Sequence, residues 1–393
     1  MSWEKVKISD FTSVITGGTP STTKTEYWEN GNIPWLNSGA LNQEIITSSE
    51  NFITQAGMEN SSTRMMPKDT ILIALTGTTT GVVGYLSIEA CANQSVTGIL
   101  PSPKHHPKFL YYYLKSIRAQ ILEASYGGAQ KHISQAFVKE LLIPLPPLST
   151  QKRIADILDT ADALRRKDQE LLTKYDQLAQ AIFIDMFGDP VKNEKGWEVK
   201  KGEYLLEVIG GAAFKSSDYL NEGIPLIRIG TVNKGFFDEN QLVYLPEYFK
   251  ESFSKYLIYP GDLLMTLTGT VGKDDYGNVF IMTDKYESCL LNQRVAKLKI
   301  IEKLLNPRYL EYILKQKEIK AELTGVSRGV RQANISNSDI YTLNIIAPPI
   351  ELQNEFAQRI KLLEIQKNIQ QNSHSTSLFA SLIQQAFNGT LVS

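Results

Sequence analysis

The sequence lacks the features of secreted and membrane proteins. It contains only two cysteines in 393 residues, and no apolar run approaches the roughly 18 residues that suggest a membrane helix. Residues 1–20 show no basic stretch followed by an apolar one, so no secretory signal is expected. Cys91 and Cys289 lie at matching places in a repeat and have no Cys or His neighbour at ligand spacing. We therefore expect neither a disulfide nor a bound metal, and a reducing cytoplasmic location.

What the chain does have is one long internal repeat, whose offset drifts only from 191 to 202 residues. A unit of about 195 residues is far longer than a solenoid repeat, so each copy is a whole domain with an appendage. The two copies share a set of recurring motifs but differ in the segments between these motifs. This indicates one task performed on two related targets. The matches include Trp3-Glu4 with Trp197-Glu198, Gly17-Gly18 with Gly210-Gly211, Leu75-Thr76-Gly77-Thr78 with Leu267-Thr268-Gly269-Thr270, Asn93-Gln94 with Asn292-Gln293, and Pro146-Pro147 and Gln151 with Pro348-Pro349 and Gln353.

The net charge of −1 conceals two basic stretches. Residues 101–139 hold six Lys or Arg against one Glu, a net of +5, and residues 285–331 hold eleven against five, a net of +6. Residues 149–190 are acidic, with six basic against eight acidic side chains. Positive charge at the same place in both copies is the expected footprint of a polyanion site. The alternative is a pair of solvated helices rich in lysine.

Each copy divides into a globular part and a long helix. Residues 1–148 and 191–349 mix short β-rich runs, such as 70–75, 82–88, 263–267 and 279–282, with turns rich in Gly, Pro, Asn and Thr. A helix is expected after Pro107 and after Pro307, with the proline in its first turn. This mixture predicts an α+β fold for both parts.

The segment 149–190 predicts a single long helix, and 350–393 a second one. Apolar residues at alternating steps of three and four are typical of a coiled-coil seam. Ser149 or Thr150 is a candidate cap, and Gly188-Asp189-Pro190 should end the first helix. In the second helix the pattern fades over 366–377, where the helix is solvated, bent or covered by a partner. The predicted seam consists of Ile154, Ile157, Ala161, Leu164, Leu171, Tyr175, Leu178 and Ile182 in the first helix and Leu352, Phe356, Ile360 and Leu363 in the second.

No convincing catalytic set is present in the sequence. Asp189, Glu198 and Lys200 loosely imitate a nuclease arrangement, but the first copy has nothing similar and Asp189 sits at a helix stop. The glycine-rich turns match no phosphate-binding loop. We therefore predict no catalytic residue and no cofactor for this chain.

What remains is recognition chemistry. Polar and basic side chains beside glycine-rich turns can present donors and acceptors to base edges and phosphates. For each of them the alternative is turn chemistry or a buried amide, and we favour that alternative for Asn93-Gln94 and Asn292-Gln293, which recur unchanged. The predicted DNA-binding residues are Thr19, Ser21, Thr22, Lys24, Asn37, Ser38, Thr78, Thr79, Thr80, Gln130 and Lys131 in the first copy, and Lys215, Ser216, Arg228, Thr270, Lys273, Arg294, Arg328, Arg331 and Gln332 in the second.

Taken in this order and in duplicate, these motifs resemble the specificity (S) subunit of type I restriction-modification systems over nearly the full length. The resemblance also includes Gly127–Ser134 and the Pro-Pro-Leu…Gln entry to the first long helix. The second copy departs from the pattern at Arg328–Gln332, where Gly128–Lys131 stands in the first.

The resemblance implies two pseudo-twofold-related target recognition domains, at 1–148 and 191–349, separated by two long antiparallel coiled-coil helices at 149–190 and 350–393. Each domain would read one half of a split, asymmetric DNA sequence. The helices would set the spacing and dock two modification (methyltransferase) subunits. S-adenosylmethionine, ATP and Mg²⁺ would be bound by the modification and restriction subunits. Half-sites one DNA turn apart lie about 34–36 Å from each other, and a 34-residue helix spans roughly 50 Å.

Two other functions stay open at this point. A self-contained DNA-modifying or DNA-cutting enzyme would methylate or cleave DNA without partners. A duplicated protein- or glycan-binding scaffold would expose aromatic clusters on both copies and show no salt-dependent affinity for DNA. Tyr111-Tyr112-Tyr113 could support the scaffold, but its place in a helix after Pro107 predicts core packing.

Overall fold

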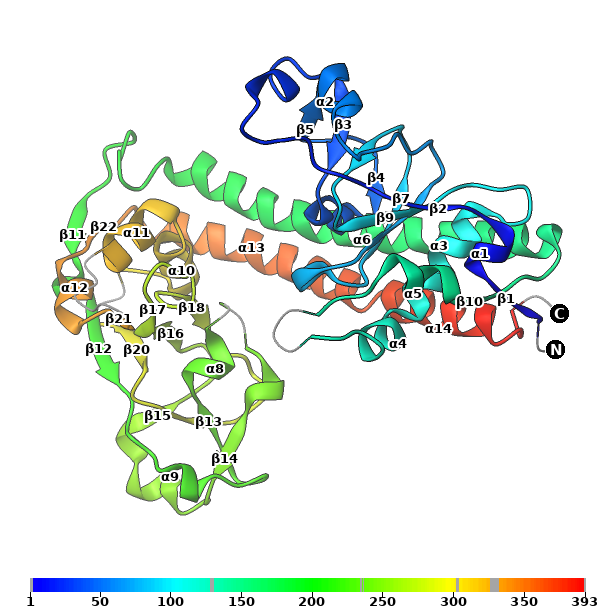
Figure 1. Ribbon diagram of the computed structural model, residues 1–393. Coiled ribbons are helices and arrows are strands. Elements are labelled where there is room, and N and C mark those ends of the chain that lie inside the picture. The colour runs from blue at the N-terminus through cyan, green and yellow to red at the C-terminus, as the bar shows by residue number, and fades with distance from the viewer. Residues whose placement is uncertain are drawn as a thin grey trace. The chain divides into compact units, whose positions relative to one another are not determined.

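The computed structural model describes residues 3–127, 131–233, 235, 237–301, 304–325 and 332–391 (Figure 1). The chain divides into two compact units. Unit 1 comprises Met1–Glu170 with Gln371–Ser393, and unit 2 comprises Leu171–Gln370. Each unit contains the globular part of one repeat copy, named lobe 1 (residues 3–147) and lobe 2 (residues 188–349), together with segments of the long helices.

Lobe 1 is built on a five-stranded sheet, in the order β2-β9-β6-β7-β4, and a three-stranded sheet, β5-β3-β8; a further pair joins β1 to β10. Strands β3 and β8 run parallel, so their carboxyl ends meet at one edge. The strands are β1 Lys5–Lys7, β2 Val14–Thr16, β3 Ile33–Leu36, β4 Ile45–Ile46, β5 Asn51–Ile53, β6 Ile71–Ala74, β7 Val83–Leu86, β8 Cys91–Ala92, β9 Val96–Ile99 and β10 Leu142–Pro144.

Lobe 2 repeats most of this topology, with four strands in each of its two larger sheets. Its sheets run β12-β20-β16-β18 and β14-β13-β19-β15, with the pairs β11-β22 and β17-β21, and β13 is parallel to β19 as β3 is to β8. The two copies therefore share one α+β fold, as the repeat predicted. The strands are β11 Val199–Lys201, β12 Leu206–Gly210, β13 Ile224–Ile227, β14 Val243–Leu245, β15 Leu257–Ile258, β16 Leu263–Thr266, β17 Thr268–Thr270, β18 Val279–Ile281, β19 Cys289–Leu291, β20 Val295–Ile300, β21 Gln332–Asn334 and β22 Asn344–Ile346.

The helices of the lobes also correspond. The two helices expected after prolines are confirmed as α3 and α10, each with proline in its first turn. Tyr111, Tyr112 and Tyr113 are all buried in the core, as predicted. Lobe 1 contains α1 Ile8–Phe11, η1 Thr25–Tyr27, η2 Ser38–Gln43, α2 Gln55–Glu59, η3 Gly77–Thr79, α3 Pro107–Ser116, α4 Arg118–Glu123 and α5 Gln135–Glu140; lobe 2 contains α7 Gly202–Leu205, η4 Ser216–Asp218, α8 Ile229–Val232, η5 Glu239–Gln241, α9 Phe249–Ser252, η6 Ser254–Tyr256, α10 Pro307–Leu314, α11 Lys317–Gly325 and α12 Asn337–Thr342.

The first long helix, α6 Leu148–Phe187, ends as predicted before Gly188, whose φ of +77° suits glycine. Because α6 begins at Leu148, Ser149 and Thr150 lie inside its first turn, and their predicted capping role is wrong. The second long helix is divided into α13 Ile350–Gln371 and α14 Ser375–Phe387, with His374 in the left-handed region at φ +55°. The division falls where the apolar pattern fades.

The helix segments within each unit pack antiparallel. In unit 1, Asp168 accepts a hydrogen bond from Ser373, and the Arg165 guanidinium lies 5.4 Å from the ring centroid of Phe379. In unit 2, Lys367 donates to Asp176, while Phe183 contacts Phe356 edge to face. In both units, higher residue numbers on α6 therefore face lower numbers on its partner helix.

The predicted seam on α6 is only partly correct. Ile154 and Ala161 are buried, but Leu164, Leu171 and Leu178 are 47%, 36% and 46% exposed. The buried stripe keeps Ile154 and Ala161 but otherwise lies mostly one position further along the chain, because α6 packs against the lobe helices as well as against a partner helix. The stripe consists of Ile154, Ala155, Leu158, Ala161 and Asp162 in unit 1, and Ala179, Phe183, Met186 and Phe187 in unit 2.

The remaining seam positions are intermediate or buried. Ile157, Tyr175 and Ile182 are half-buried. On α13, Phe356 and Ile360 are fully buried, while Leu352 and Leu363 pack partly buried against the same cluster. The predicted face of α13 is therefore confirmed. Among the described residues, no helix combines the length and apolar character needed to cross a membrane.

Candidate nucleic-acid interface

Backbone hydrogen bonds bring four loop segments to one edge of lobe 1. The N–H of Asn93 donates to the Leu36 carbonyl at 2.8 Å, the N–H of Leu75 donates to Ser95 at 2.8 Å, and the N–H of Ile133 donates to Leu75 at 2.9 Å. The end of β3, the turn after β8, the end of β6 and the segment before α5 are thereby joined. We refer to residues 36–38, 75–80, 93–95 and 131–133 as loop edge 1.

Lobe 2 builds the same edge with the same bonds. The N–H of Asn292 donates to Ile227 at 3.0 Å, the N–H of Leu267 to Arg294 at 2.9 Å, and the N–H of Ile335 to Leu267 at 2.8 Å. We refer to residues 227–229, 267–270, 292–294 and 332–335 as loop edge 2. The recurring Thr-Gly-Thr and Asn-Gln motifs thus form a common frame on which the residues that differ between copies are displayed.

Several predicted binding residues of the first copy lie together on loop edge 1. Asn37 follows β3 and caps η2, accepting from the N–H of Ala40 at 3.1 Å, and Ser38 opens that helix. Thr19 joins the edge by donating to Gln94. The amide nitrogen of Asn37 has no partner among the described residues, so it is available as a donor.

The Thr-Gly-Thr turn lies next to Lys131. The N–H of Gly77 donates to the Lys131 carbonyl at 3.2 Å, and the side chains of Thr78 and Lys131 are exposed. The structure therefore brings together segments that are more than 50 positions apart in the chain. Thr79 is half-buried and donates to Thr76 at 3.3 Å.

Thr80 is not available to DNA, and the prediction for this residue is wrong. Its side chain is 1% exposed, and its hydroxyl lies 2.8 Å from the Gly77 carbonyl and 2.7 Å from that of Lys131. The hydroxyl thus holds the turn to the neighbouring segment. Sequence alone could not separate this structural threonine from the exposed Thr78.

Ser21, Thr22 and Lys24 are exposed on the segment that leads into η1. The hydroxyl of Ser21 shares a hydrogen bond with that of Thr23 at 2.9 Å, and the Lys24 ammonium donates to the Tyr27 hydroxyl at 3.0 Å. Their exposure is compatible with contact to a ligand, but no hydrogen bond between the described residues joins these three side chains to loop edge 1.

In lobe 2, Arg228, Thr270 and Arg294 lie on loop edge 2, with Lys273 exposed in the turn after Thr270. Lys215 and Ser216 are exposed at the start of η4. Gln332 is paired through its backbone with Thr270, across the β17–β21 ladder. The predictions for Gln130, Arg328 and Arg331 lie outside the described residues.

Arg228 occupies the place of Asn37, at the residue that follows the central strand. Its guanidinium lies 5.1 Å from the ring centroid of Tyr219 and donates to the Gln241 carbonyl at 3.0 Å, while its Nε is buried without a partner in the described part of the chain. The side chain is therefore held in place within the lobe, with part of its donor capacity unused.

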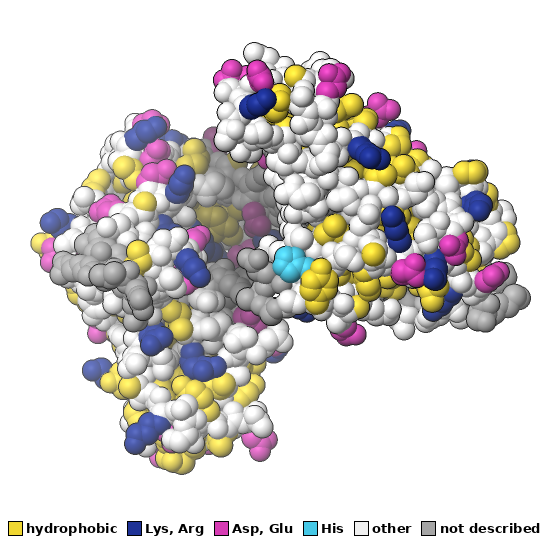
Figure 2. All heavy atoms as spheres, viewed as in Figure 1, with side chains coloured by type: hydrophobic (Ala, Val, Ile, Leu, Met, Phe, Trp, Pro, Cys, Tyr) yellow, Lys and Arg dark blue, Asp and Glu magenta, His cyan; other side chains and the backbone are white. Residues whose placement is uncertain are grey.

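The two basic stretches are largely engaged inside the protein. Lys108 pairs with Asp159 at 3.1 Å and Lys115 with Glu44 at 3.0 Å. In lobe 2, Lys297 and Lys299 are likewise paired with carboxylates, at 2.7 and 2.8 Å. On the face drawn in Figure 2, Lys and Arg side chains are scattered among acidic and uncharged ones. The expected concentrated basic footprint is therefore not found at these lysines.

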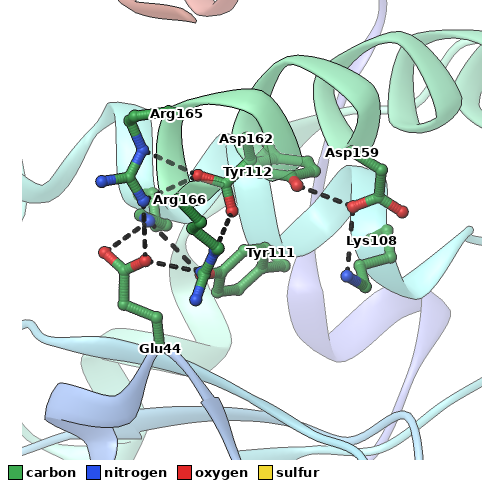
Figure 3. A network of polar contacts seen from close by, with 9 residues as sticks. Glu44, Lys108, Tyr111, Tyr112, Asp159, Asp162, Arg165 and Arg166 are labelled. Carbon is green, nitrogen blue, oxygen red and sulfur yellow. Dashed lines mark hydrogen bonds and ion pairs between the residues drawn. The ribbon is translucent and has the colours of Figure 1, made fainter. Parts of the chain in front are cut away.

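A partly buried ionic network ties the end of η2 to α6 (Figure 3). Glu44, which follows η2, is contacted by Arg165 at 3.1 Å, by Arg166 at 2.6 Å and by Lys115 at 3.0 Å. The buried Asp162 accepts from both arginines at 2.7 Å. Each charge in the network thus has partners of the opposite sign.

Electrostatics favour the ionised forms of these carboxyl groups. Burial opposes ionisation of Glu44, but the hydrogen bond and charge of Lys115 and the charges of the two arginines outweigh it, so its pKa is lowered. Burial likewise opposes ionisation of Asp162, and the hydrogen bonds from Arg166 and Arg165 lower its pKa. Sequence reasoning missed this network, because Glu44 lies 121 positions from Arg165.

A polar pocket of about 300 Å³ opens beside Asn37. It is lined by Trp35, Asn37, Gln43, Ser49 and Asn51 among others. Amide and hydroxyl groups of this kind can recognise the edge of a base. The pocket places hydrogen-bonding groups next to Asn37, the position at which we expect the two copies to differ in the bases they recognise.

An apolar groove lies between α6 and α14 in unit 1. Ile157, Ala161 and Leu164 on α6 face Leu378 and Leu382 on α14 across it. In unit 2, α13 carries a comparable stripe, with Leu362 and Ile369 65% and 61% exposed. Exposed apolar surface of this kind marks an interaction site.

The carboxylates that loosely resembled a nuclease set have structural roles. Asp189 accepts from the N–H groups of Val191 and Lys192 at 2.9 and 3.1 Å, and these bonds lower its pKa. Glu198 pairs with Lys200 on the surface. Among the described residues, no three His, Cys, Asp or Glu side chains gather in a metal-binding group. The loop edges present donors and acceptors, which is recognition chemistry.

The chain, with its duplicated lobes and loop edges, belongs to a class of DNA-specificity proteins. The family model for the type I restriction modification DNA specificity domain matches residues 1–174 and 194–376, and the chain belongs to this family. Both matches include a lobe together with helix residues that follow it.

Individual relatives span most of the chain. The type I restriction enzyme MjaIX specificity subunit of Methanocaldococcus jannaschii is 29% identical over 402 aligned residues, covering 93% of this chain and 89% of the relative. The MjaVIII specificity subunit of the same organism is 25% identical, covering 92% and 86%. The crystal structure of the S subunit from M. genitalium superposes with a TM-score of 0.60 at 18% identity, covering 98% of this chain and 96% of that one. It supports the fold.

Proposed function

We propose that this chain is the DNA sequence-recognition subunit of a type I restriction-modification complex in the cytoplasm, and that each lobe reads one half of a split, asymmetric target. Membership of the specificity-domain family supports the DNA-recognition role. The single observation that supports recognition of one half-site by each lobe is the duplicated loop edge. The same backbone bonds join the same four segments in both lobes, whereas the displayed side chains differ, as Asn37 and Arg228 do.

The proposed base contacts follow from side-chain chemistry. An asparagine amide pairs best with adenine and an arginine guanidinium with guanine, and each such contact discriminates by about 1–3 kcal/mol. Thr19, Thr78 and Lys131 on the first edge, and Thr270, Lys273 and Arg294 on the second, would contribute further contacts to bases or phosphates. The long helices would set the distance between the half-sites.

The apolar faces of the helices are the proposed docking sites for two methyltransferase subunits. The groove between Leu164 and Leu382 in unit 1 and the stripe around Leu362 in unit 2 would each be covered by one of them. S-adenosylmethionine would bind to those subunits, and ATP and Mg²⁺ to the complex through the restriction subunits. This chain would then contribute recognition without a reaction centre of its own.

Comparing the methylated DNA of cells with and without the gene tests the central proposal. We expect deletion to remove one split, adenine-methylated motif. The Asn37→Ala variant should then relax one half of that motif and the Arg228→Ala variant the other. Unchanged methylation after deletion, or relaxation of the same half by both variants, would contradict the proposal.

Copurification with tagged methyltransferase subunits tests the docking face. We expect Leu164→Lys combined with Leu382→Lys to abolish copurification, because each places a charge in the apolar groove. Gln177→Lys, at an exposed polar position of the same helix, is the matched control and should copurify normally. Full copurification of the double variant would exclude this groove as the docking site.

A further inference from the structure

Each lobe is joined to its long helix through one buried glutamine. Gln151 is the fourth residue of α6 and Gln353 is the fourth residue of α13. Their exposures are 1% and 0%. Both follow a Pro-Pro pair at the same distance, Pro146-Pro147 and Pro348-Pro349.

In lobe 1 the side chain of Gln151 bridges three segments. Its Oε1 accepts from the N–H of His106 at 2.8 Å, and its Nε2 donates to the Pro146 carbonyl at 2.8 Å. His106 immediately precedes α3, and Pro146 belongs to the connection that leads into α6. One amide thus ties the start of the lobe helix to the start of the long helix.

In lobe 2, Gln353 makes the same bonds and one more. Its Oε1 accepts from the N–H of Asn306 at 2.8 Å, and its Nε2 donates to Pro348 at 2.7 Å and to Leu304 at 2.9 Å. Asn306 is the N-cap of α10. The two joints, which lie at matching places in the repeat, therefore use the same residue for the same geometry.

The chemistry of the joint requires glutamine. The site needs an acceptor and a donor on one side chain, at the end of a two-methylene arm. Glutamate in its ionised form lacks the donor, leucine lacks both groups, and asparagine is one methylene shorter. The segments that it joins are stiff, because Pro107, Pro147 and their counterparts have fixed φ angles. A fully satisfied buried polar group between stiff segments specifies one arrangement.

The joint also connects two parts, the lobe and its long helix, whose relative placement affects the spacing of the half-sites. Helix α3 carries Phe109 and Tyr112 at 0% exposure, and α10 carries Tyr309 and Leu310 at 0% exposure, so each lobe helix moves with its core. Helices α6 and α13 continue without a break for 40 and 22 residues. A small change of angle at the joint is therefore carried to the whole lobe, and the displacement grows with distance from the joint.

We propose that Gln151 and Gln353 are positioning residues that fix the angle of each lobe on its helix and thereby confine the complex to one half-site spacing. This inference rests on the proposed function, since spacing has meaning only for a split target. Loss of either amide would leave the bases read by each lobe unchanged and would widen the range of spacings that is accepted. A merely structural role would instead lower methylation at every site alike.

The test uses the full chain coexpressed with its methyltransferase subunits in a host without this system, followed by sequencing of methylated adenines. The wild-type complex should methylate one split motif with one spacer length. With Gln151→Leu or Gln353→Leu, we expect the same half-sites to be methylated also at spacers one base pair longer or shorter. Methylation at these new sites should reach at least about a tenth of its extent at the original sites, corresponding to a preference of about 1.4 kcal/mol or less.

The exposed glutamines Gln177 on α6 and Gln358 on α13 provide matched controls. Their replacement by leucine should leave a single spacer length. Gln151→Glu and Gln353→Glu keep the arm and the acceptor but set a carboxyl oxygen against the Pro146 or Pro348 carbonyl in place of the donor, so we expect them to relax the spacing as well.

Leucine and glutamate variants that keep one spacer length, or that lose methylation evenly without a new spacing, would overturn the inference. Absence of any split motif with the wild-type chain would instead contradict the proposed function itself. The two failures are therefore distinguishable.

Discussion

The two lobes share a backbone frame and a glutamine joint, but the charged side chains that attach them to their helices differ. In unit 1, Glu44 reaches from the end of η2 to Arg165 and Arg166 on α6. In the described part of unit 2, the ion pairs of α13 with other elements come from α10 and α6, through Arg308–Glu364 and Lys367–Asp176. The end of η2 in lobe 1 is thus tied directly to α6 by charge, whereas among the described residues of lobe 2 the charged tie to α13 comes from α10.

Contacting rings occur in the cores of both units. In unit 2 they are Phe183, Phe187, Tyr309 and Phe356. In unit 1, Tyr112 contacts Phe379 and also donates to the carboxylate of Asp159 at 2.6 Å. Both copies are therefore anchored by aromatic packing, and unit 1 adds polar ties from lobe side chains to α6. The units should respond differently to mutation, pH and salt.

The largest expected effect is the loss of the aromatic cluster. Phe183→Ala should destabilise unit 2 by about 3–5 kcal/mol, because it removes a fully buried ring and leaves a cavity. Hydrogen exchange of peptides from each unit would measure this, and protection should fall in unit 2 far more than in unit 1. The control Ile184→Ala, at a side chain 42% exposed, should change little. Equal loss of protection in both units would show that the units do not unfold separately.

The second effect is a loss of stability of unit 1 in acid. Burial, with a smaller contribution from the charge of His106, lowers the pKa of His105 to about 4, whereas lobe 2 has the apolar Leu305 at this place. Between about pH 6.5 and 4 the unfolded chain binds the proton and the folded chain does not, so stability of unit 1 is lost as pH falls, by up to about 1.4 kcal/mol per pH unit.

The variant His105→Leu imitates lobe 2 and should reduce this acid sensitivity in unit 1. Exchange protection measured from pH 7 to 5 would show it, with unit 2 as the internal reference. An unchanged pH dependence of unit 1 in the variant would contradict the assignment to His105.

A third, smaller effect should follow from Glu44→Gln. The two arginines would lose one carboxylate but keep Asp162, so we expect a loss of about 1–2 kcal/mol in unit 1. The loss should shrink at high salt, where ion pairs are screened. Glu29→Gln, at an exposed residue of the same lobe, is the control for chemical denaturation measurements. A salt-independent loss would indicate a packing role for Glu44.

The smallest effects are expected from single exposed lysines on the loop edges. Lys131→Ala and Lys273→Ala should each weaken DNA binding by the complex modestly and reduce the slope of log affinity against log salt by about 1. Lys152→Ala and Lys361→Ala, at exposed positions on the long helices, should leave the slope unchanged. Similar slopes for all four variants and the wild type would place these lysines away from the DNA.

Local signals predicted much of the fold. The prolines correctly predicted α3 and α10, and Gly188 correctly predicted the end of α6. The four predicted β-rich runs correspond to β6, β7, β16 and β18. These features depend on neighbours in sequence, which fix φ angles and hydrogen-bond donors. The predicted seam on α6 was partly misplaced. Leu164, Leu171 and Leu178 recur every seven residues, but α6 buries the neighbouring face, which packs against a lobe helix as well as against a partner helix.

The candidate site shows the same division. Asn37, Lys131, Arg228 and Thr270 could be singled out as polar residues that differ between the copies or flank a glycine turn. Thr80 could not be excluded, because its burial depends on a carbonyl 51 positions away. The basic stretches were overestimated as a footprint, because the carboxylates that pair with Lys108 and Lys115 lie on distant segments.

The sequence by itself determined that one α+β domain with a long helix occurs twice, and in which order its elements follow, because repeats, prolines and apolar periods are local properties. Only the tertiary structure decided which charges are neutralised inside the protein, which face of α6 stays exposed, and which amide joins lobe to helix. Those outcomes depend on side chains from distant segments meeting in space, and each contact is selected by the burial and hydrogen-bonding of all its neighbours at once.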